Sequence, residues 1–310
     1  MKKKEKHLIN VFGKCSPLGV DNINSTNLCL GLNELVTLAA MYNNTVTNNR
    51  HKIAKTHFKN PTKLINALDK KLHTVCAKGD DFCWINQPFV KMSDIYTKIR
   101  DNFRPLKPSS WIANSKTWLN TNDIFNVMIQ YTKKYNFFSF PGVFPVDFMD
   151  TYNNSSQCIT REMCGFNLKE LIGKGKNEIG FVINLDKHDE PGSHWVAIYG
   201  NADPMSKKFG LCYYDSMGYP YNRYIDKFFT IYKEQATTLH GEKVMKKFQV
   251  KHNSIKHQHK NTECGIYSMI FLILCIENKN ETFDKTLKRI GVKSDDLINE
   301  YRNKLYVPTM

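Results

Sequence analysis

The chain has 310 residues, of which 41% are hydrophobic, 24% charged and 12% aromatic. This length and composition exclude a disordered chain and a small disulfide-stapled domain, and they favour one large or two modest globular domains. The formal net charge of +15 would suit contact with a polyanion such as nucleic acid. Because charge alone carries no geometry, a lysine-rich solvated surface is the favoured interpretation.

The first third of the chain is predicted to be helical. Apolar residues recur at helical spacing over 33–42, and Pro61 opens a second such stretch that ends near Val75. Two prolines and two serines over 104–110 indicate a linker. We therefore expect a helical N-terminal domain over 1–108 and a second domain over 109–310.

The second domain interleaves strands with helices. The β-rich runs are predicted strands, and 222–236 is a predicted helix. An apolar run over 264–276 is too short to span a bilayer and is predicted to be a buried helix. This order of elements favours an α+β fold in which helices flank a mixed central sheet. The predicted strands cover 179–185, 194–199, 209–214 and 247–252.

The cysteines are expected to be reduced thiols. Their number is odd, no signal peptide is evident, and the chain is far larger than a disulfide-stapled domain, so a cytosolic setting is favoured. His73, Cys76 and Cys83 have loosely metal-like spacing but lack a fourth ligand, so we expect buried thiols and no metal. The nine cysteines are Cys15, Cys29, Cys76, Cys83, Cys158, Cys164, Cys212, Cys264 and Cys275.

Cys264 stands where a polar loop enters the apolar helix. The first amides of a helix lack intrahelical partners and carry a partial positive charge, which favours thiolate over thiol. Gly265 allows a substrate carbonyl to approach closely, and the same amides can receive a developing oxyanion. Cys264 is therefore a candidate nucleophile, although a lone cysteine in an apolar helix is usually a core residue, as we expect for Cys275.

Three further residues complete a cysteine-protease set. His194 begins one predicted strand and Asp215 ends the next, so neighbouring strands would place the carboxylate where it orients the imidazole and stabilises its charged form. Gln258 can donate the second oxyanion hydrogen bond. Each residue alone has an ordinary structural explanation, but their ordered combination favours catalysis. Three histidines in the loop before the nucleophile are expected to be solvated: His252, His257 and His259.

These motifs resemble the ubiquitin-like-protein (SUMO) proteases and the adenovirus-type proteases. The resemblance rests on a His-Trp pair at 194–195, an Asp-Ser pair at 215–216, and Gln258 six residues before the Cys-Gly pair at 264–265. A Trp-Leu-Asn run at 118–120 also resembles the signature that opens the core of that superfamily.

Within the superfamily, the chain is similar to the polyprotein-processing proteases of large DNA viruses of the African swine fever virus type. This closer similarity lies in 194–198, 257–259, 262–265 and the tail 302–306, and the resemblance as a whole covers roughly residues 111–310.

The resemblance implies a papain-like protease core, preceded by a helical arm domain and needing no cofactor. It implies that His194, Asp215, Gln258 and Cys264 are catalytic, and that cleavage follows Gly-Gly in viral structural polyproteins during virion maturation, in the host cytoplasm and the virion. Trp195 is then the expected wall of a narrow channel that admits only glycine.

Two positions depart from the pattern. The viral proteases of the African swine fever virus type carry asparagine where this chain has Asp215. A carboxylate should hold His194 as imidazolium more firmly than an amide, so we expect no loss of activity. Glu263 stands where cellular members usually have aspartate, and it keeps the charge.

Other function classes use the same features. An isopeptidase that removes ubiquitin-like modifiers would use the same catalytic residues. An acetyltransferase on this fold would need a coenzyme A site, for example at Lys207 and Lys208, but no Gly-rich phosphate loop is present. A non-catalytic module could bind through the basic surface, and nucleic acid could also modulate a protease.

Overall fold

The computed structural model describes residues 8–9, 13–152, 155–291 and 293–307. The chain divides into two compact units. We call Met1–Asn10 with Pro108–Asn303 the sheet unit, and Val11–Lys107 with Lys304–Met310 the helical unit. The chain passes from the helical unit to the sheet unit between Lys107 and Pro108, next to the predicted domain boundary at 108/109. A segment from each end of the chain is, however, grouped with the other unit, which that division does not anticipate.

The helical unit is built around α2 (Leu32–Thr45) and α3 (Pro61–Leu72), at the positions of the two predicted helices. Leucines on one face of each helix share an apolar core. Pro61 and the side chain of Asn60, which accepts from the Lys63 amide at 3.0 Å, fix where α3 begins. The remaining helices of the unit are short: η1 (Gly19–Asn22), α1 (Ile23–Thr26), η2 (Asn49–His51), η3 (Lys55–His57), α4 (Asp81–Ile85), α5 (Pro88–Lys91) and α6 (Tyr96–Arg100).

A segment from the other end of the chain completes this unit. Val307 is buried in the core of the helical unit and forms a parallel bridge with Leu106. Its amide donates to the Pro105 carbonyl at 2.8 Å, and its carbonyl accepts from the Lys107 amide at 2.9 Å. The helical unit is therefore assembled from two stretches that are distant in the sequence.

The sheet unit contains one mixed six-stranded sheet, which confirms the predicted α+β class. The strand order is β1-β3-β4-β5-β6, and β2 also pairs with β3. The pairs β3–β4 and β4–β5 are antiparallel, whereas β1, β2 and β6 each pair in parallel. The strands are β1 (Phe138–Ser139), β2 (Val143–Pro145), β3 (Glu178–Asn184), β4 (Trp195–Asn201), β5 (Gly210–Tyr214) and β6 (Gln249–His252).

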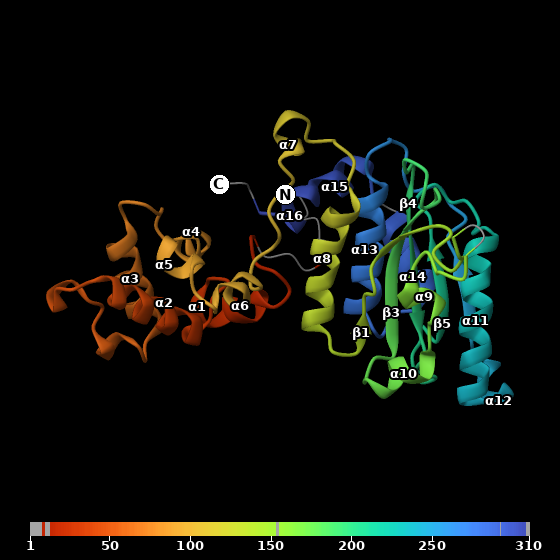
Figure 1. The fold of residues 1–310 in the computed structure, drawn as a ribbon, viewed down its shortest axis with the longest axis horizontal. Coiled ribbons are helices and arrows are strands. Elements are labelled where there is room, and N and C mark those ends of the chain that lie inside the picture. Colours follow the sequence, from red (N-terminus) through yellow and green to blue (C-terminus); the bar gives the residue numbers. More distant parts are fainter. Residues whose placement is uncertain (1–7, 10–12, 153–154, 292, 308–310) are drawn as a thin grey trace, which may run out of the picture. The chain divides into compact units, whose positions relative to one another are not determined.

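Helices cover both faces of this sheet, as Figure 1 shows, with α8 and α13 on one side and α11 on the other. Alternate residues of β3, β4 and β5 point to opposite faces, so one set packs with the aromatic residues of α11. The other set meets α13, where Tyr214 stacks on Phe271 at 4.9 Å between ring centroids. The helices are α7 (Ser110–Ala113), α8 (Thr121–Lys134), α9 (Arg161–Cys164), α10 (Leu168–Gly173), α11 (Arg223–His240), α12 (Glu242–Met245), α13 (Cys264–Glu277), α14 (Phe283–Gly291), α15 (Asp295–Glu300) and α16 (Arg302–Leu305).

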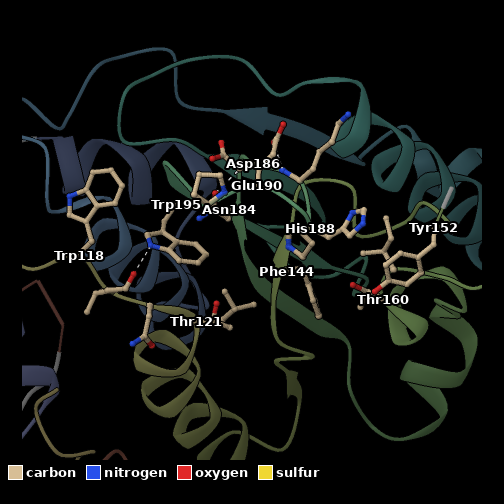
Figure 2. Close-up of a pocket in the computed structure, with 18 residues that line it drawn as sticks. Trp118, Thr121, Phe144, Tyr152, Thr160, Asn184, Asp186, His188, Glu190 and Trp195 are labelled. Atoms are coloured by element: carbon tan, nitrogen blue, oxygen red, sulfur yellow. Dashed lines mark hydrogen bonds between the residues drawn. The ribbon is translucent and has the colours of Figure 1, made fainter. Parts of the chain in front are cut away.

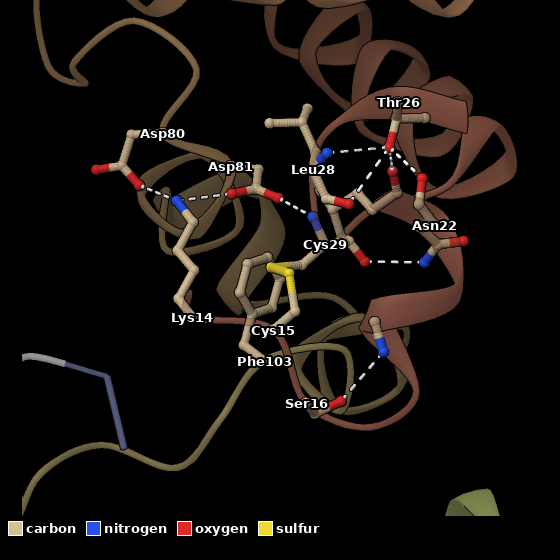
Figure 3. Close-up of a disulfide and its surroundings, with 12 residues drawn as sticks. Lys14, Cys15, Ser16, Asn22, Thr26, Leu28, Cys29, Asp80, Asp81 and Phe103 are labelled. Atoms are coloured by element: carbon tan, nitrogen blue, oxygen red, sulfur yellow. Dashed lines mark hydrogen bonds and ion pairs between the residues drawn. A yellow bond between two sulfur atoms is a disulfide. The ribbon is translucent and has the colours of Figure 1, made fainter. Parts of the chain in front are cut away.

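Six of the nine cysteines form disulfides, so the expectation of reduced thiols is wrong for them. The fold brings the two Cα atoms of each pair to 5.1, 5.7 and 6.2 Å, within bonding range. Figure 3 shows the Cys15–Cys29 disulfide, which lies beside an ion-pair cluster in which Lys14 bridges Asp80 and Asp81 at 2.7 Å each. The disulfides are Cys15–Cys29, Cys76–Cys83 and Cys158–Cys164.

Two further properties of the described residues concern metals and membranes. Cys76 and Cys83 are bonded to each other rather than free as ligands, and the described chain contains no group of three acidic, histidine or cysteine side chains placed to hold a metal ion. No helix in the same part of the chain is both long and apolar enough to cross a membrane.

Candidate active site

Helix α13 begins at the cysteine that the sequence singles out. Cys264 is the first residue of the helix and is 3% exposed, and the residues after it are buried through Ile276. Three cysteines are free in the described chain. Burial raises the pKa of the Cys212 and Cys275 thiols, which keeps them protonated in the core. Cys264 is the free cysteine whose interaction with a histidine raises the pKa of that histidine.

That histidine is His194, immediately before β4. Its Nε2 lies 2.7 Å from Oδ1 of Asp215, which follows β5. The antiparallel pairing of β4 with β5 brings the two residues together, as their positions in the sequence predict. Because Nε2 faces the carboxylate, the other ring nitrogen is left for the thiol of Cys264.

Asp215 is fully buried and rigidly held. Its Oδ1 also accepts from the Met217 amide at 2.8 Å. The side chain of Asn253 clamps its backbone by accepting from the Asp215 amide at 2.9 Å and donating to the Asp215 carbonyl at 2.5 Å. Gly218 closes the turn at φ +79°, where an added Cβ would lie 2.8 Å from the Ile255 backbone. The carboxylate therefore has little freedom to leave the imidazole.

The charge state of His194 follows from these contacts. Burial lowers the pKa of the imidazole, but hydrogen bonds to Asp215 and then to Cys264 outweigh burial and raise the pKa to about 9. The ring is therefore an imidazolium at neutral pH, next to a thiol at a helix N-terminus. Both features favour an ion pair of thiolate and imidazolium.

Gln258 lies in the loop between β6 and α13. It is 2% exposed, and its Nε2 donates to the Lys260 carbonyl at 2.7 Å. The amide has two N–H groups, so one remains for a substrate oxygen. His257, the preceding residue, is also buried, at 5% exposure, and its Nδ1 meets the Tyr214 hydroxyl at 3.1 Å. The expectation of a solvated loop is therefore wrong for His257, because the loop folds back over the end of β5.

The Trp-Leu-Asn run of the sequence supports the site from the start of α8. The Leu119 carbonyl accepts from Nε1 of Trp195 at 2.9 Å (Figure 2), and Asn120 forms a capping box with Asp123. An added Cβ on Gly265 would lie 2.9 Å from Leu119 and 3.3 Å from Trp195. Close packing beside the nucleophile therefore favours glycine at 265, because a larger residue would displace the side chain of Leu119.

A protease family matches the segment that carries these groups. The model for the Ulp1 protease family, C-terminal catalytic domain, matches residues 177–308. This segment is a Ulp1-like protease domain. The matched range contains His194, Asp215, Gln258 and Cys264.

Viral proteases match a larger part of the chain. A putative thiol protease of Acanthamoeba polyphaga mimivirus is 28% identical over 308 residues, which cover 93% of this chain and 91% of that protein. A cysteine protease of African swine fever virus is 27% identical over 238 residues, covering 71% of this chain and 80% of that protein. The protein is therefore a cysteine protease.

The fold of this protease is similar to a solved viral structure. The crystal structure of an African swine fever virus protease matches with a TM-score of 0.57 at 21% identity, covering 85% of this chain and 94% of that one. The match confirms the predicted protease fold, with its mixed sheet, flanking helices and N-terminal helical region.

A cavity of about 560 Å³ opens in the sheet unit of the protease. Figure 2 shows that it runs from Trp118 and Trp195 to Tyr152, Thr160 and His188. Trp118 is 46% exposed, whereas Trp195 is 7% exposed. The cavity therefore has one exposed and one buried aromatic wall at this end, and the buried one, Trp195, lies near Gly265.

Several supporting residues of the protease were not identified from the sequence. Asn253 has no motif signal of its own, and Arg302 was noted only within the similar tail 302–306, with no role, because the partners of both residues lie far away in the chain. Arg302 donates to the Thr117 carbonyl at 2.7 Å and to the Thr262 carbonyl at 2.5 Å, so it ties together the segments that precede Trp118 and the nucleophile.

Thr262 and Glu263, the two residues before the nucleophile, are hydrogen-bonded to each other. Glu263 is 1% exposed, and its carboxylate accepts from the Thr262 amide at 3.0 Å and from the Thr262 hydroxyl at 2.7 Å. An acidic residue at 263, noted in the sequence as a conservative departure, thus fixes the turn that leads into α13.

Proposed function

We propose that the protein is an endopeptidase in which Cys264 is the nucleophile, His194 the acid and base, and Asp215 the residue that orients His194. The observation that supports this most directly is the 2.7 Å hydrogen bond between His194 and the buried Asp215, in a site where Cys264 at the start of α13 also raises the pKa of His194. Asp215 and the helix terminus both favour the charged pair that attack on a carbonyl needs.

The proposed reaction has two stages. The thiolate adds to the scissile carbonyl, and the negative oxygen receives hydrogen bonds from the first amides of α13 and from the free N–H of Gln258. His194 then donates its proton to the leaving amine, which departs and leaves a thioester on Cys264. Water gives a proton to His194 and attacks the thioester, which releases the carboxylic acid and restores the thiolate.

We further propose that the residues before the scissile bond are Gly-Gly. The support is steric, because the fixed ring of Trp195 lies against the backbone at Gly265, next to the nucleophile. A side chain on the substrate at this point would meet the indole, whereas glycine would not.

The proposed biological substrate is a viral structural polyprotein cleaved during virion maturation, in the host cytoplasm and the virion. The support is that the similar curated proteases come from large DNA viruses. A second candidate function, removal of a ubiquitin-like modifier, is favoured by the name SUMO-1 cysteine protease that one African swine fever virus relative carries.

Matched peptides test these proposals. We expect the protein to cleave a Gly-Gly-Ala peptide between its second and third residues, and to cleave the Gly-Ala-Ala and Ala-Gly-Ala versions at least tenfold more slowly. Cys264→Ala should remove all turnover while the melting temperature stays within a few degrees. Cleavage of a SUMO conjugate, with none of the peptide or of a Gly-Gly-containing polypeptide, would replace the first candidate by the second. Activity in Cys264→Ala would overturn both.

A further inference from the structure

The residue after Asp215 contacts the proposed oxyanion donor. Ser216 is 1% exposed, and its hydroxyl donates to Oε1 of Gln258 at 2.7 Å. Its carbonyl accepts from the amides of His257 at 2.8 Å and Gln258 at 2.9 Å. Two consecutive residues that follow β5 therefore orient two different groups of the site. Asp215 contacts the imidazole of His194, and Ser216 contacts the side-chain amide of Gln258.

The partners of Gln258 fix which way its amide faces. A carbonyl oxygen can only accept, so the Lys260 carbonyl at 2.7 Å must meet the NH₂ end of the amide. The Oε1 end then meets the Ser216 hydroxyl, which can donate. Both ends are satisfied in one orientation, and the second N–H is free to point toward a substrate oxygen.

We infer that Ser216 is a positioning residue, whose hydroxyl anchors Oε1 of Gln258 and so keeps the second N–H directed at the oxyanion that develops on the substrate. The inference rests on the proposed roles of Cys264 and Gln258. Without the hydroxyl, the buried Oε1 loses its donor, and only the hydrogen bond to the Lys260 carbonyl still holds the amide, so the amide can turn about that bond. A turned amide no longer directs its second N–H at the negative oxygen, which then loses a hydrogen bond in the transition state.

The backbone of this loop is held independently of the Ser216 hydroxyl. The Ser216 carbonyl contacts remain in an alanine variant. Asp295, which is 5% exposed, accepts from the amides of His259 and Lys260 at 2.7 Å each through one oxygen and from the Tyr267 hydroxyl at 2.8 Å through the other. Ser216→Ala should therefore change the orientation of the amide while the loop stays in place.

Three measurements on Ser216→Ala test the inference. With a peptide that the wild type cleaves, we expect kcat to fall on the order of tenfold or more and KM to change less than about threefold, because the donor acts mainly in the transition state. Binding of a peptide aldehyde, which forms a tetrahedral adduct with an oxyanion-like oxygen, should weaken by a similar factor. Alkylation of Cys264 by iodoacetamide develops no oxyanion, so its rate should stay within about twofold.

A double-mutant cycle separates this inference from the proposed function. Gln258→Ala should lower kcat on the order of a hundredfold, and Ser216→Ala/Gln258→Ala should be no slower than Gln258→Ala. The matched control is Thr286→Val, which removes another buried hydroxyl, one without a hydrogen-bond partner in the described residues.

Independent, multiplicative losses in the double variant would overturn the role of Ser216, as would an alkylation rate that falls as much as kcat. A Gln258→Ala variant with wild-type kcat would instead overturn the proposed oxyanion donor. The two failures therefore give different results.

Discussion

Oδ1 of Asp215 accepts from both His194 Nε2 and the Met217 amide. The same oxygen therefore orients the imidazole and is itself held in place by the backbone of the following turn. The pKa of His194, raised to about 9, depends on this contact and on the hydrogen bond to Cys264, which together outweigh burial. The carboxylate thus sets the upper pH limit at which the imidazolium persists.

Asp215→Asn tests that limit. The imidazolium is the form that donates to the leaving amine, and the wild type keeps it up to a pH of about 9. Because an amide lacks the charge that favours imidazolium, the alkaline limb of kcat/KM should move to lower pH in the variant, while activity near neutrality is retained. The measurement is kcat/KM against pH for both proteins, with Asp226→Asn on α11 as a control. An unchanged alkaline limb would contradict the assignment of Asp215.

The same contact affects stability. The pKa of His194 in the folded protein lies above its ordinary value of 6.5, so the contribution of His194 to stability is complete below pH 6.5 and is lost as the pH rises through about 9. The Asp215→Asn variant should therefore lose less stability than the wild type between these pH values.

At the scale of elements, most of the sheet unit is predictable. The strands of the sequence prediction agree with β3, β4, β5 and β6 within about two residues. The signal is strongest in β3 and β4, which are rich in β-branched and aromatic side chains, and weakest in β6, which contributes only Val250. The strands β1 and β2 have two and three residues, too few to show alternation, and they were not predicted. Disulfide pairing was also missed, since spacing alone does not give connectivity.

The candidate site was predictable in part for a related reason. Residues in sequence motifs, such as His194, Asp215 and Cys264, could be named from their order and their places at element ends. Residues that act through a distant backbone group could not. Asn253 clamps Asp215 across 38 positions, and Arg302 reaches Thr117 across 185, contacts that exist only in the folded chain.

The first residue of β3 carries a buried carboxyl group at the start of the strand. Burial raises the pKa of Glu178 from 4.5 to about 7, because the charged form is poorly solvated there. A raised pKa means that the folded state binds the proton more tightly than the unfolded chain. Glu178 therefore costs stability as the pH rises from about 4.5 through about 7.

Glu178→Gln should remove this dependence. The amide keeps the hydrogen-bonding capacity toward Asn201, 3.2 Å away, but does not ionise. The free energy of unfolding of the variant should exceed that of the wild type at pH 8 by roughly 2–3 kcal/mol more than it does at pH 4.5. Urea denaturation at both pH values gives this difference, with the exposed Glu234→Gln as a control. Equal differences at the two pH values would show that Glu178 ionises freely.

At the scale of the whole molecule, the disulfides are unevenly distributed. Cys15–Cys29 and Cys76–Cys83 lie in the helical unit, while Cys158–Cys164 lies in the sheet unit. A disulfide restricts the unfolded chain and stabilises the fold by about 2–4 kcal/mol, more for longer loops. The helical unit therefore depends more on oxidation than the unit that carries Cys264.

Calorimetry with and without a reductant tests this dependence. We expect a reductant to lower the transition of the helical unit by several degrees and to leave that of the sheet unit less affected. In the Cys15→Ala/Cys29→Ala variant, the transition temperature of the helical unit should be lower even without the reductant, and the reductant should lower it by less than in the wild type. Identical scans of the wild type in both conditions would show that these pairs add nothing to stability.

The place of Val307 in the helical unit bears on how the chain is made. Residues 13–107 leave the ribosome first, yet the core that they form includes Val307. The Pro105 carbonyl and the Lys107 amide, on either side of Leu106, have their hydrogen-bond partners only once Val307 has been made. During translation, the helical unit must therefore remain unfinished until the whole sheet unit has emerged. Slow steps in the folding of the sheet unit would then leave apolar surface of the helical unit exposed to chaperones.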